Sequence, residues 1–143
     1  MHDGWKENWR VLAPSTDGRV TLPRRGGIRA AADELRELSP GAQVAICASG
    51  FGALRRVRKC ARQVGLVGRR EYLVFPTVEE PAYLIEDSSS SVEYFFNTVA
   101  TVPPGVATLE AAANVGLRGL RIASRSRLLR ALIPGRILVG SRP

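Results

Sequence analysis

The chain has 143 residues, which is enough for one ordinary hydrophobic core. Its hydrophobic fraction of 45% and charged fraction of 24% are typical of a globular protein and exclude disorder along the whole chain. The formal net charge of +8 predicts attraction to polyanions. It does not identify one, because an arginine-rich composition can also come from GC-rich coding.

The first predicted elements follow an irregular N-terminal segment. Residues 1–22 are expected to be largely irregular, and "GRVTLP" (18–23) suggests a short strand. A helix is predicted over 27–38, where apolar residues recur at helical spacing. These residues are Ile28, Ala31, Leu35 and Leu38. The sequence "SPG" ends this helix, because a residue before proline avoids helical geometry and glycine supplies the turn.

Strand and helix patterns then alternate. The run "AQVAICAS" (42–49) is almost continuously apolar, which is typical of a central strand covered on both faces, as in parallel sheets. Residues 51–64 have one apolar face and are predicted to form a helix that ends at Gly65. Two further strands, 69–76 and 82–87, are separated by "TVEEP" and predict an antiparallel hairpin.

The C-terminal part is predicted to be mainly helical. Residues 86–101 contain several serines that can cap a helix start, followed by an aromatic-rich apolar face. Further helices are expected at about 106–117 and, with a basic surface, at 124–133. The closing segment "RILVGS" (136–141) predicts a last strand.

This order of elements predicts an α/β fold in which a small sheet is packed against helices. The expected organisation is an irregular segment over 1–22 followed by one α/β domain over 23–143. The sequence shows no internal repeat.

A cytoplasmic location is predicted from the N-terminus and the cysteines. The segment "MHDGWKENWRVLAP" has no apolar signal-peptide core, and no apolar stretch approaches the ~20 residues that cross a bilayer. The two cysteines, Cys47 and Cys60, both lie in patterns that predict buried positions, so reduced thiols are expected rather than a disulfide.

The predicted helix over 51–64 carries a cluster of cations opposite its apolar face. An anion-contacting surface is one interpretation of this cluster, and the solvated outer face of an ordinary amphipathic helix is the more common one. No aromatic stacking platform lies nearby to favour nucleic acid specifically. The candidate anion-binding residues are Arg55, Arg56, Arg58, Lys59 and Arg62.

Other kinds of chemistry receive little support. A structural zinc site needs four Cys or His ligands, whereas the chain has two cysteines and only His2, so no metal site is predicted. A nucleophilic triad is not expected either, because His2 lies at the N-terminus and both thiols are predicted to be buried. The start of the helix "GGIRAAADEL" could bind an anion, but it lacks the G-x-G-x-x-G spacing of a dinucleotide site.

The arrangement over residues 27–87 resembles the second half of a class I S-adenosylmethionine-dependent methyltransferase. In that family a helix leads into "L-x-P-G-G", then come the fifth strand, a helix ending in "A-G-F" and a closing antiparallel strand pair. The matching residues are Leu38, Pro40, Gly41, Val44 to Ala48, Val64, Gly65 and Leu66, with Ala42 in place of the second glycine. The segment "REYLVFPTVEEPAYLIED" is similar to methyltransferase-like proteins of bacterial polysaccharide and natural-product pathways. The resemblance implies a reduced Rossmann-like sheet with added C-terminal helices in 88–143.

The sequence also departs from this family. Its cofactor is held by a glycine-rich loop after the first strand and an acidic residue after the second, and neither is present here. The residues before "AQVAICAS" leave no room for the first three strands, because each βαβ unit needs about 30 residues. No cofactor-binding or catalytic residue can therefore be assigned. S-adenosylmethionine is expected to bind only if a partner supplies the missing elements.

Two functions follow as expectations. The resemblance implies a methyltransferase-like domain without autonomous cofactor binding, acting as a partial subunit or accessory module in a biosynthetic pathway. The alternative is a basic interaction module that binds nucleic acid or another polyanion.

A partner is expected in either case. A small sheet has an exposed edge, and the set Tyr94, Phe95 and Phe96 is large for a surface helix. The sequence therefore predicts a protein partner or self-association that covers the 91–100 helix or the sheet edge. A homodimer is the default, because closed twofold symmetry is the commonest way to cover such a surface.

Overall fold

The computed structural model describes residues 18–100, 107–123, 126, 130, 133 and 135–143. The predicted irregular segment before residue 18 and most of the predicted basic helix over 124–133 lie outside these residues. The chain divides into two compact units, one of residues 1–84 with 133–143 and the other of residues 85–132. No described helix is long and apolar enough to cross a membrane.

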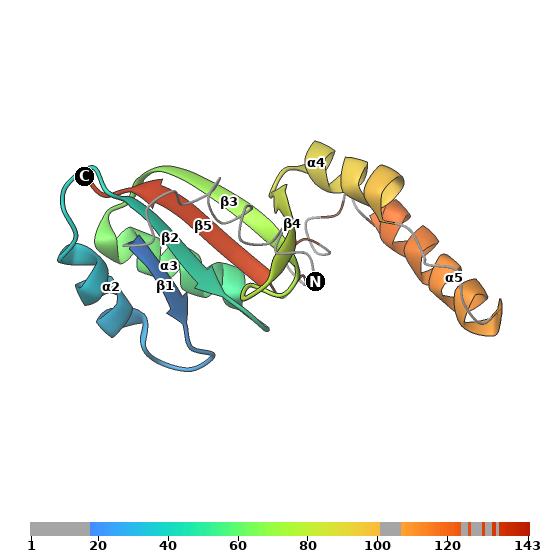
Figure 1. Cartoon of the computed structure of the whole chain (residues 1–143), viewed down its shortest axis with the longest axis horizontal. Coiled ribbons are helices and arrows are strands. Elements are labelled where there is room, and N and C mark those ends of the chain that lie inside the picture. Colours follow the sequence, from blue (N-terminus) through green and yellow to red (C-terminus); the bar gives the residue numbers. More distant parts are fainter. Residues whose placement is uncertain (1–17, 101–106, 124–125, 127–129, 131–132, 134) are drawn as a thin grey trace. The chain divides into compact units, whose positions relative to one another are not determined.

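The described residues form a five-stranded sheet with helices, which confirms the predicted α/β class (Figure 1). The spatial order of the strands is β1-β2-β5-β3-β4. Their bounds are β1 (Arg19–Leu22), β2 (Gln43–Ala48), β3 (Val67–Pro76), β4 (Pro81–Glu86) and β5 (Gly135–Ser141). All five were predicted from the sequence to within about two residues at each end.

The strand directions show how the sheet is assembled. Strand β1 pairs with β2 in parallel, and β5 is antiparallel to both β2 and β3. Strands β1, β2 and β3 therefore run in one direction, with the C-terminal strand reversed between β2 and β3. Strand β4 neighbours β3, and only residues 77–80 connect them, as the predicted hairpin requires.

Helices α2 (Ile28–Arg36) and α3 (Ala53–Val64) pack on one face of the sheet (Figure 1). Their buried residues form a single cluster with Val44 and Ile46 of β2 and Leu138 of β5. Helix α3 ends at Gly65, whose φ of 77° is left-handed and therefore favours glycine.

The opposite face of the sheet forms a second apolar cluster. It includes Ala45 and Cys47, which alternate along β2 with the residues of the first cluster, and Ile137 and Val139 of β5. All of Val44 to Ala48 are fully buried. This confirms the prediction that the apolar run over 42–49 is a central strand covered on both faces, although one of its two neighbours is antiparallel.

The second unit contains the remaining described helices. Helix α4 (Ser89–Tyr94) begins after Ser88, whose hydroxyl accepts a 3.1 Å hydrogen bond from the Ser91 amide. It continues as a π-helical segment, η2 (Phe95–Val99), so the helix predicted over 86–101 is shorter at both ends and changes its winding. Phe95 and Phe96 are buried and lie edge to face with ring centroids 5.4 Å apart.

Helix α5 (Ala107–Ala123) is longer than the predicted 106–117. Arg121 near its end donates a 2.8 Å hydrogen bond to the carbonyl of Phe96, which ties α5 to η2. In the same unit Arg130 forms an ion pair of 3.2 Å with Asp87, and both side chains are largely buried.

Candidate anion-binding site

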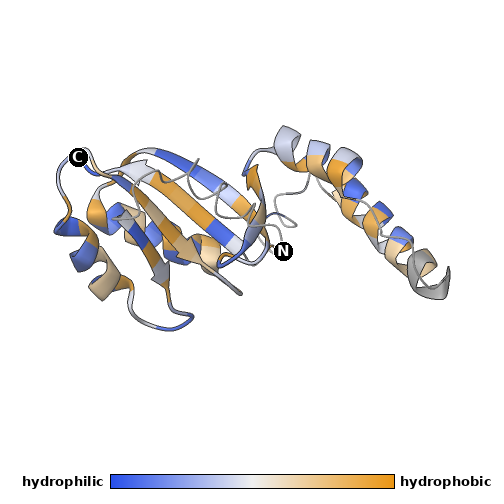
Figure 2. Ribbon diagram, viewed as in Figure 1, coloured by the Kyte–Doolittle hydropathy of each residue, from blue (hydrophilic) through white to orange (hydrophobic). Residues whose placement is uncertain are grey.

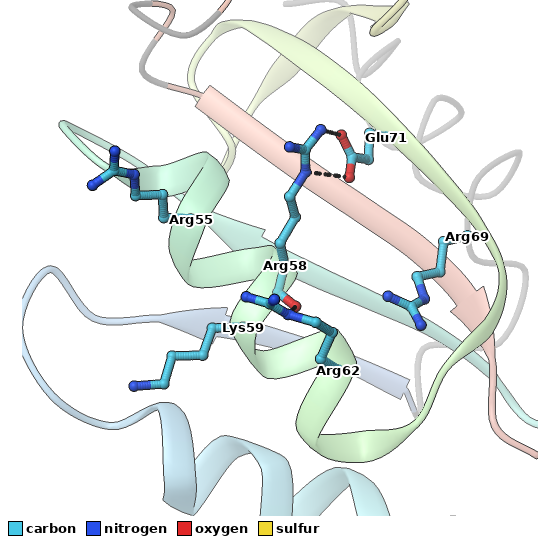
Figure 3. A pocket seen from close by; sticks show the side chains of 6 residues that line it. All are labelled: Arg55, Arg58, Lys59, Arg62, Arg69 and Glu71. Atoms are coloured by element: carbon cyan, nitrogen blue, oxygen red, sulfur yellow. Dashed lines mark hydrogen bonds and ion pairs between the residues drawn. The ribbon is translucent and has the colours of Figure 1, made fainter.

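Four cationic side chains of α3 lie around one cavity of about 550 Å³ (Figure 3). They are Arg55, Arg58, Lys59 and Arg62, whose i, i+3, i+4, i+7 spacing is that of one helix face. The lining is completed by two residues of β3, Arg69 and Glu71. The cavity therefore brings together residues from two elements that are consecutive along the chain.

The helical period explains why the cations face this cavity. Val57, Cys60, Ala61 and Val64 of α3 are buried against the sheet, so the residues between them project from the outer side of the helix. After the turn at Gly65, β3 returns alongside, and its exposed first half places charged residues beside α3.

Arg58 and Glu71 form the central ion pair of the site. The Nε and one terminal nitrogen of Arg58 donate hydrogen bonds of 2.7 Å to the two carboxylate oxygens of Glu71, as Figure 3 shows. This two-pronged geometry is the preferred way for a guanidinium to bind a carboxylate or a phosphate. Glu71 is the less exposed partner, with 23% of its side chain accessible against 51% for Arg58.

Two further guanidinium groups are held by backbone carbonyls. Arg69 Nε donates a 2.7 Å hydrogen bond to the carbonyl of Leu66, and Arg62 Nε donates a longer one of 3.4 Å to the carbonyl of Arg58. Both bonds use the Nε atom, so the terminal nitrogens of Arg62 and Arg69 keep their donors for another acceptor.

Arg55 and Lys59 lie at the rim. In Figure 3 both extend to the side of α3 away from Arg69. Neither forms an ion pair with another described residue, and the same holds for Arg62 and Arg69. Within the lining, Glu71 is thus one carboxylate among five cations, so the cavity carries a positive field.

Arg56, the remaining candidate from the sequence, does not line the cavity. Its guanidinium donates hydrogen bonds to the carbonyl of Pro23, at 3.1 Å, and to the carbonyl of Ser49. It therefore links α3 to the segments that follow β1 and β2. Arg56 therefore has a structural role. The other four candidates line the cavity: Arg55, Arg58, Lys59 and Arg62.

Arg69 and Glu71 were missed in the sequence because their segment was interpreted only as a strand. The available signal was the charged start "RRE" of an otherwise apolar strand directly after a basic helix. Only the pairing of Glu71 with Leu138, a residue of the helix-side core, places its side chain on the face next to α3.

The cysteines have the character of core residues. Both are free and buried. Burial raises the pKa of Cys47 to about 12 and that of Cys60 to about 11, so both thiols stay protonated and unreactive near neutral pH. The described residues contain no cluster of three or more His, Cys, Asp or Glu side chains that could hold a metal, and His2 lies outside them.

The glycines before α2 form the start of that helix. Gly27 is its N-cap, with a left-handed φ of 72°, and no side chain forms a capping hydrogen bond there.

Comparison with known proteins gives no further guide. Neither the family models, nor the curated proteins, nor the solved structures contain a match to this chain.

Proposed function

We propose that this chain is a methyltransferase-like domain without autonomous cofactor binding, acting as a partial subunit or accessory module of a polysaccharide or natural-product pathway. The supporting observation is the succession β1-α2-β2-α3-β3, in which the three strands run in one direction and both helices cover one face. A reversed strand, β5, closes the arrangement between β2 and β3.

This arrangement fits the order of elements on which the resemblance rests. The family places a helix, its fifth strand, a second helix and an antiparallel closing pair in this sequence. Over residues 27–87 this chain has α2, β2, α3 and the neighbouring strands β3 and β4 in the same order. The proposal assigns no catalytic residue and leaves S-adenosylmethionine binding to elements outside this sequence.

Isothermal titration with S-adenosylmethionine tests the proposal in two steps. The isolated chain is expected to give no binding heat up to millimolar cofactor. A fusion protein is expected to bind S-adenosylmethionine if the half of a family member that carries the glycine-rich cofactor loop is joined ahead of residue 18. Micromolar binding by the isolated chain would point to an active enzyme, and a folded fusion without binding would argue against the methyltransferase-like relationship.

A second candidate function is anion binding by the cavity beside α3, as a basic module for nucleic acid or another polyanion. The observation that favours it is that five cations from α3 and β3 line one cavity with a single carboxylate. Binding to duplex or single-stranded nucleic acid should weaken steeply with salt. It should be lost when Arg55, Arg58 and Arg62 are replaced together by Ala. Binding that survives this triple substitution would assign the effect to the general charge of the chain.

A further inference from the structure

We propose that the cavity beside α3 binds a compact ligand with a diphosphate or similarly polyvalent phosphate group, rather than an extended nucleic acid. This inference rests on the second proposed function, anion binding at the cavity, and names the ligand class. It is independent of the relationship to methyltransferases.

The first argument is that one of the donors is already oriented. The 2.7 Å bond from Nε to the carbonyl of Leu66 restrains Arg69, so less side-chain entropy is lost when its terminal nitrogens bind an anion. The 3.4 Å bond of Arg62 is long and restrains that side chain only weakly. A guanidinium fork matches two oxygens of one phosphate, and two forks from different elements match two neighbouring phosphates.

The second argument is the position of Glu71. Its carboxylate occupies both prongs of Arg58 inside the cavity, where it binds as the oxygens of a phosphate would. An incoming anion must either displace Glu71 from this edge of Arg58 or bind the remaining N–H donors beside a negative charge. A monovalent anion gains little there, whereas a polyvalent phosphate also engages Arg62 and Arg69.

The third argument is the size and composition of the cavity. It is an open hollow, and its volume of about 550 Å³ leaves room for a compact compound with two phosphate groups. Proteins that bind single strands combine a basic groove with aromatic side chains on which bases stack. None of the six residues that line this cavity is aromatic. The lining thus suits phosphate groups and offers no surface to successive bases.

Titration of inorganic pyrophosphate into the full chain at low salt tests this inference. The wild-type chain is expected to bind with about one site per chain. Arg62→Ala and Arg69→Lys should each weaken binding by about tenfold, the second because lysine keeps the charge but loses the fork. Glu71→Gln should tighten binding several-fold because the negative charge that opposes an incoming phosphate is removed.

Arg29→Ala is the matched control, because Arg29 is an exposed arginine of α2 outside the cavity lining. It removes the same charge and should change binding less than twofold. Circular dichroism and urea unfolding of each variant show that the fold is kept, and Arg69→Lys avoids the loss of volume that Arg69→Ala would cause.

A parallel titration with a single-stranded oligonucleotide distinguishes binding of a compact phosphate ligand at the cavity from the more general polyanion function. Pyrophosphate binding that depends on Arg62 and Arg69 supports the inference. Oligonucleotide binding that depends on them without pyrophosphate binding overturns it and leaves the polyanion function in place. If neither probe binds, or if Arg29→Ala weakens binding as much as Arg62→Ala, both are overturned.

Discussion

Arg55 and Arg56 are neighbours in sequence, yet the structure gives them different tasks. Arg55 is exposed at the rim of the cavity, whereas Arg56 is partly buried and donates to the carbonyls of Pro23 and Ser49. Hydrogen bonds from a charged donor contribute about 1.5–3 kcal/mol when they are partly shielded from water. Removing the charge of Arg56 should therefore lower the stability of the fold. Removing the charge of Arg55 should affect anion binding and leave the stability nearly unchanged.

Replacing Arg56 by Ala is expected to lower the free energy of unfolding by about 1–3 kcal/mol, because two carbonyls lose their donor. Arg55→Ala should stay within about 0.5 kcal/mol of the wild type, as is usual at exposed sites. Urea unfolding followed by circular dichroism measures both. Equal stabilities of the two variants would contradict the anchoring role of Arg56.

The raised pKa values of the two thiols predict a loss of stability at alkaline pH. Desolvation raises the pKa of Cys47 from its ordinary value of 9.0 to about 12 and that of Cys60 to about 11. A group whose folded pKa is raised stabilises the fold fully below its unfolded pKa, and this contribution is lost as the pH rises towards the folded value. The loss of stability should therefore begin near pH 9.

Above about pH 9 each thiol should lower the free energy of unfolding with a slope that rises towards about 1.4 kcal/mol per pH unit as the unfolded thiol ionises. Urea unfolding at pH 8 and pH 10 measures this slope. Tyrosines also titrate in the range, so the double variant Cys47→Ala/Cys60→Ala is the control, and it should show a clearly shallower loss. The same slope in both proteins would mean that the thiols do not contribute.

At the scale of elements, the start of α4 depends on one side chain. Ser88 is the N-cap, and its hydroxyl accepts from the amide of Ser91, which has no helical partner. Four consecutive serines could be mistaken for a linker in the sequence, and the structure shows that the first of them caps a helix. The helix is short, so the cap is a large part of its local stability.

Ser88→Ala is expected to destabilise this region by about 1 kcal/mol, because an amide at the helix start loses its acceptor. Ser89→Ala is the matched control, since Ser89 is exposed and alanine is the better helix former. Hydrogen exchange of the amides of residues 91–96 reports on the local effect. Faster exchange in both variants, or in neither, would contradict the capping role.

At the scale of the whole molecule, α5 is one surface that suggests a partner. The sequence pointed to the 91–100 helix or the free sheet edge, and in that helix Phe95 and Phe96 are buried whereas Tyr94 is 64% exposed. On α5, Val115 is 69% exposed and Ile122 is 85% exposed, and Figure 2 shows hydrophobic residues along this helix. Because these two residues are seven positions apart, they lie on the same face of α5, and an exposed apolar face is typical of an interaction surface.

We expect the chain to self-associate through α5, with a homodimer as the default state. Sedimentation equilibrium at micromolar concentration should give a mass above that of the 15.5 kDa monomer. Val115→Asp together with Ile122→Asp should shift the equilibrium to monomer, whereas Asn114→Asp, at an exposed polar position of the same helix, should not. A clean wild-type monomer would remove the basis for this expectation.

The sequence by itself determined the α/β class and the type of nearly every described element. Local patterns decide these features: the apolar run of β2 and the helical spacing in α2 and α3 are properties of neighbouring residues. The same periodicity placed the cations of α3 opposite its apolar face. It could not separate Arg56 from the others, because its partners, Pro23 and Ser49, lie on other segments.

Only the tertiary structure decided the order of the strands and the composition of the cavity. Strand β5 is the last element in the chain, yet it lies between β2 and β3. This pairing joins residues about 60 or more positions apart, so it leaves no local signal in the sequence. That pairing sets the face of β3 on which Glu71 lies. Glu71 and Arg69 therefore join the α3 cations through a sheet register that no local pattern encodes.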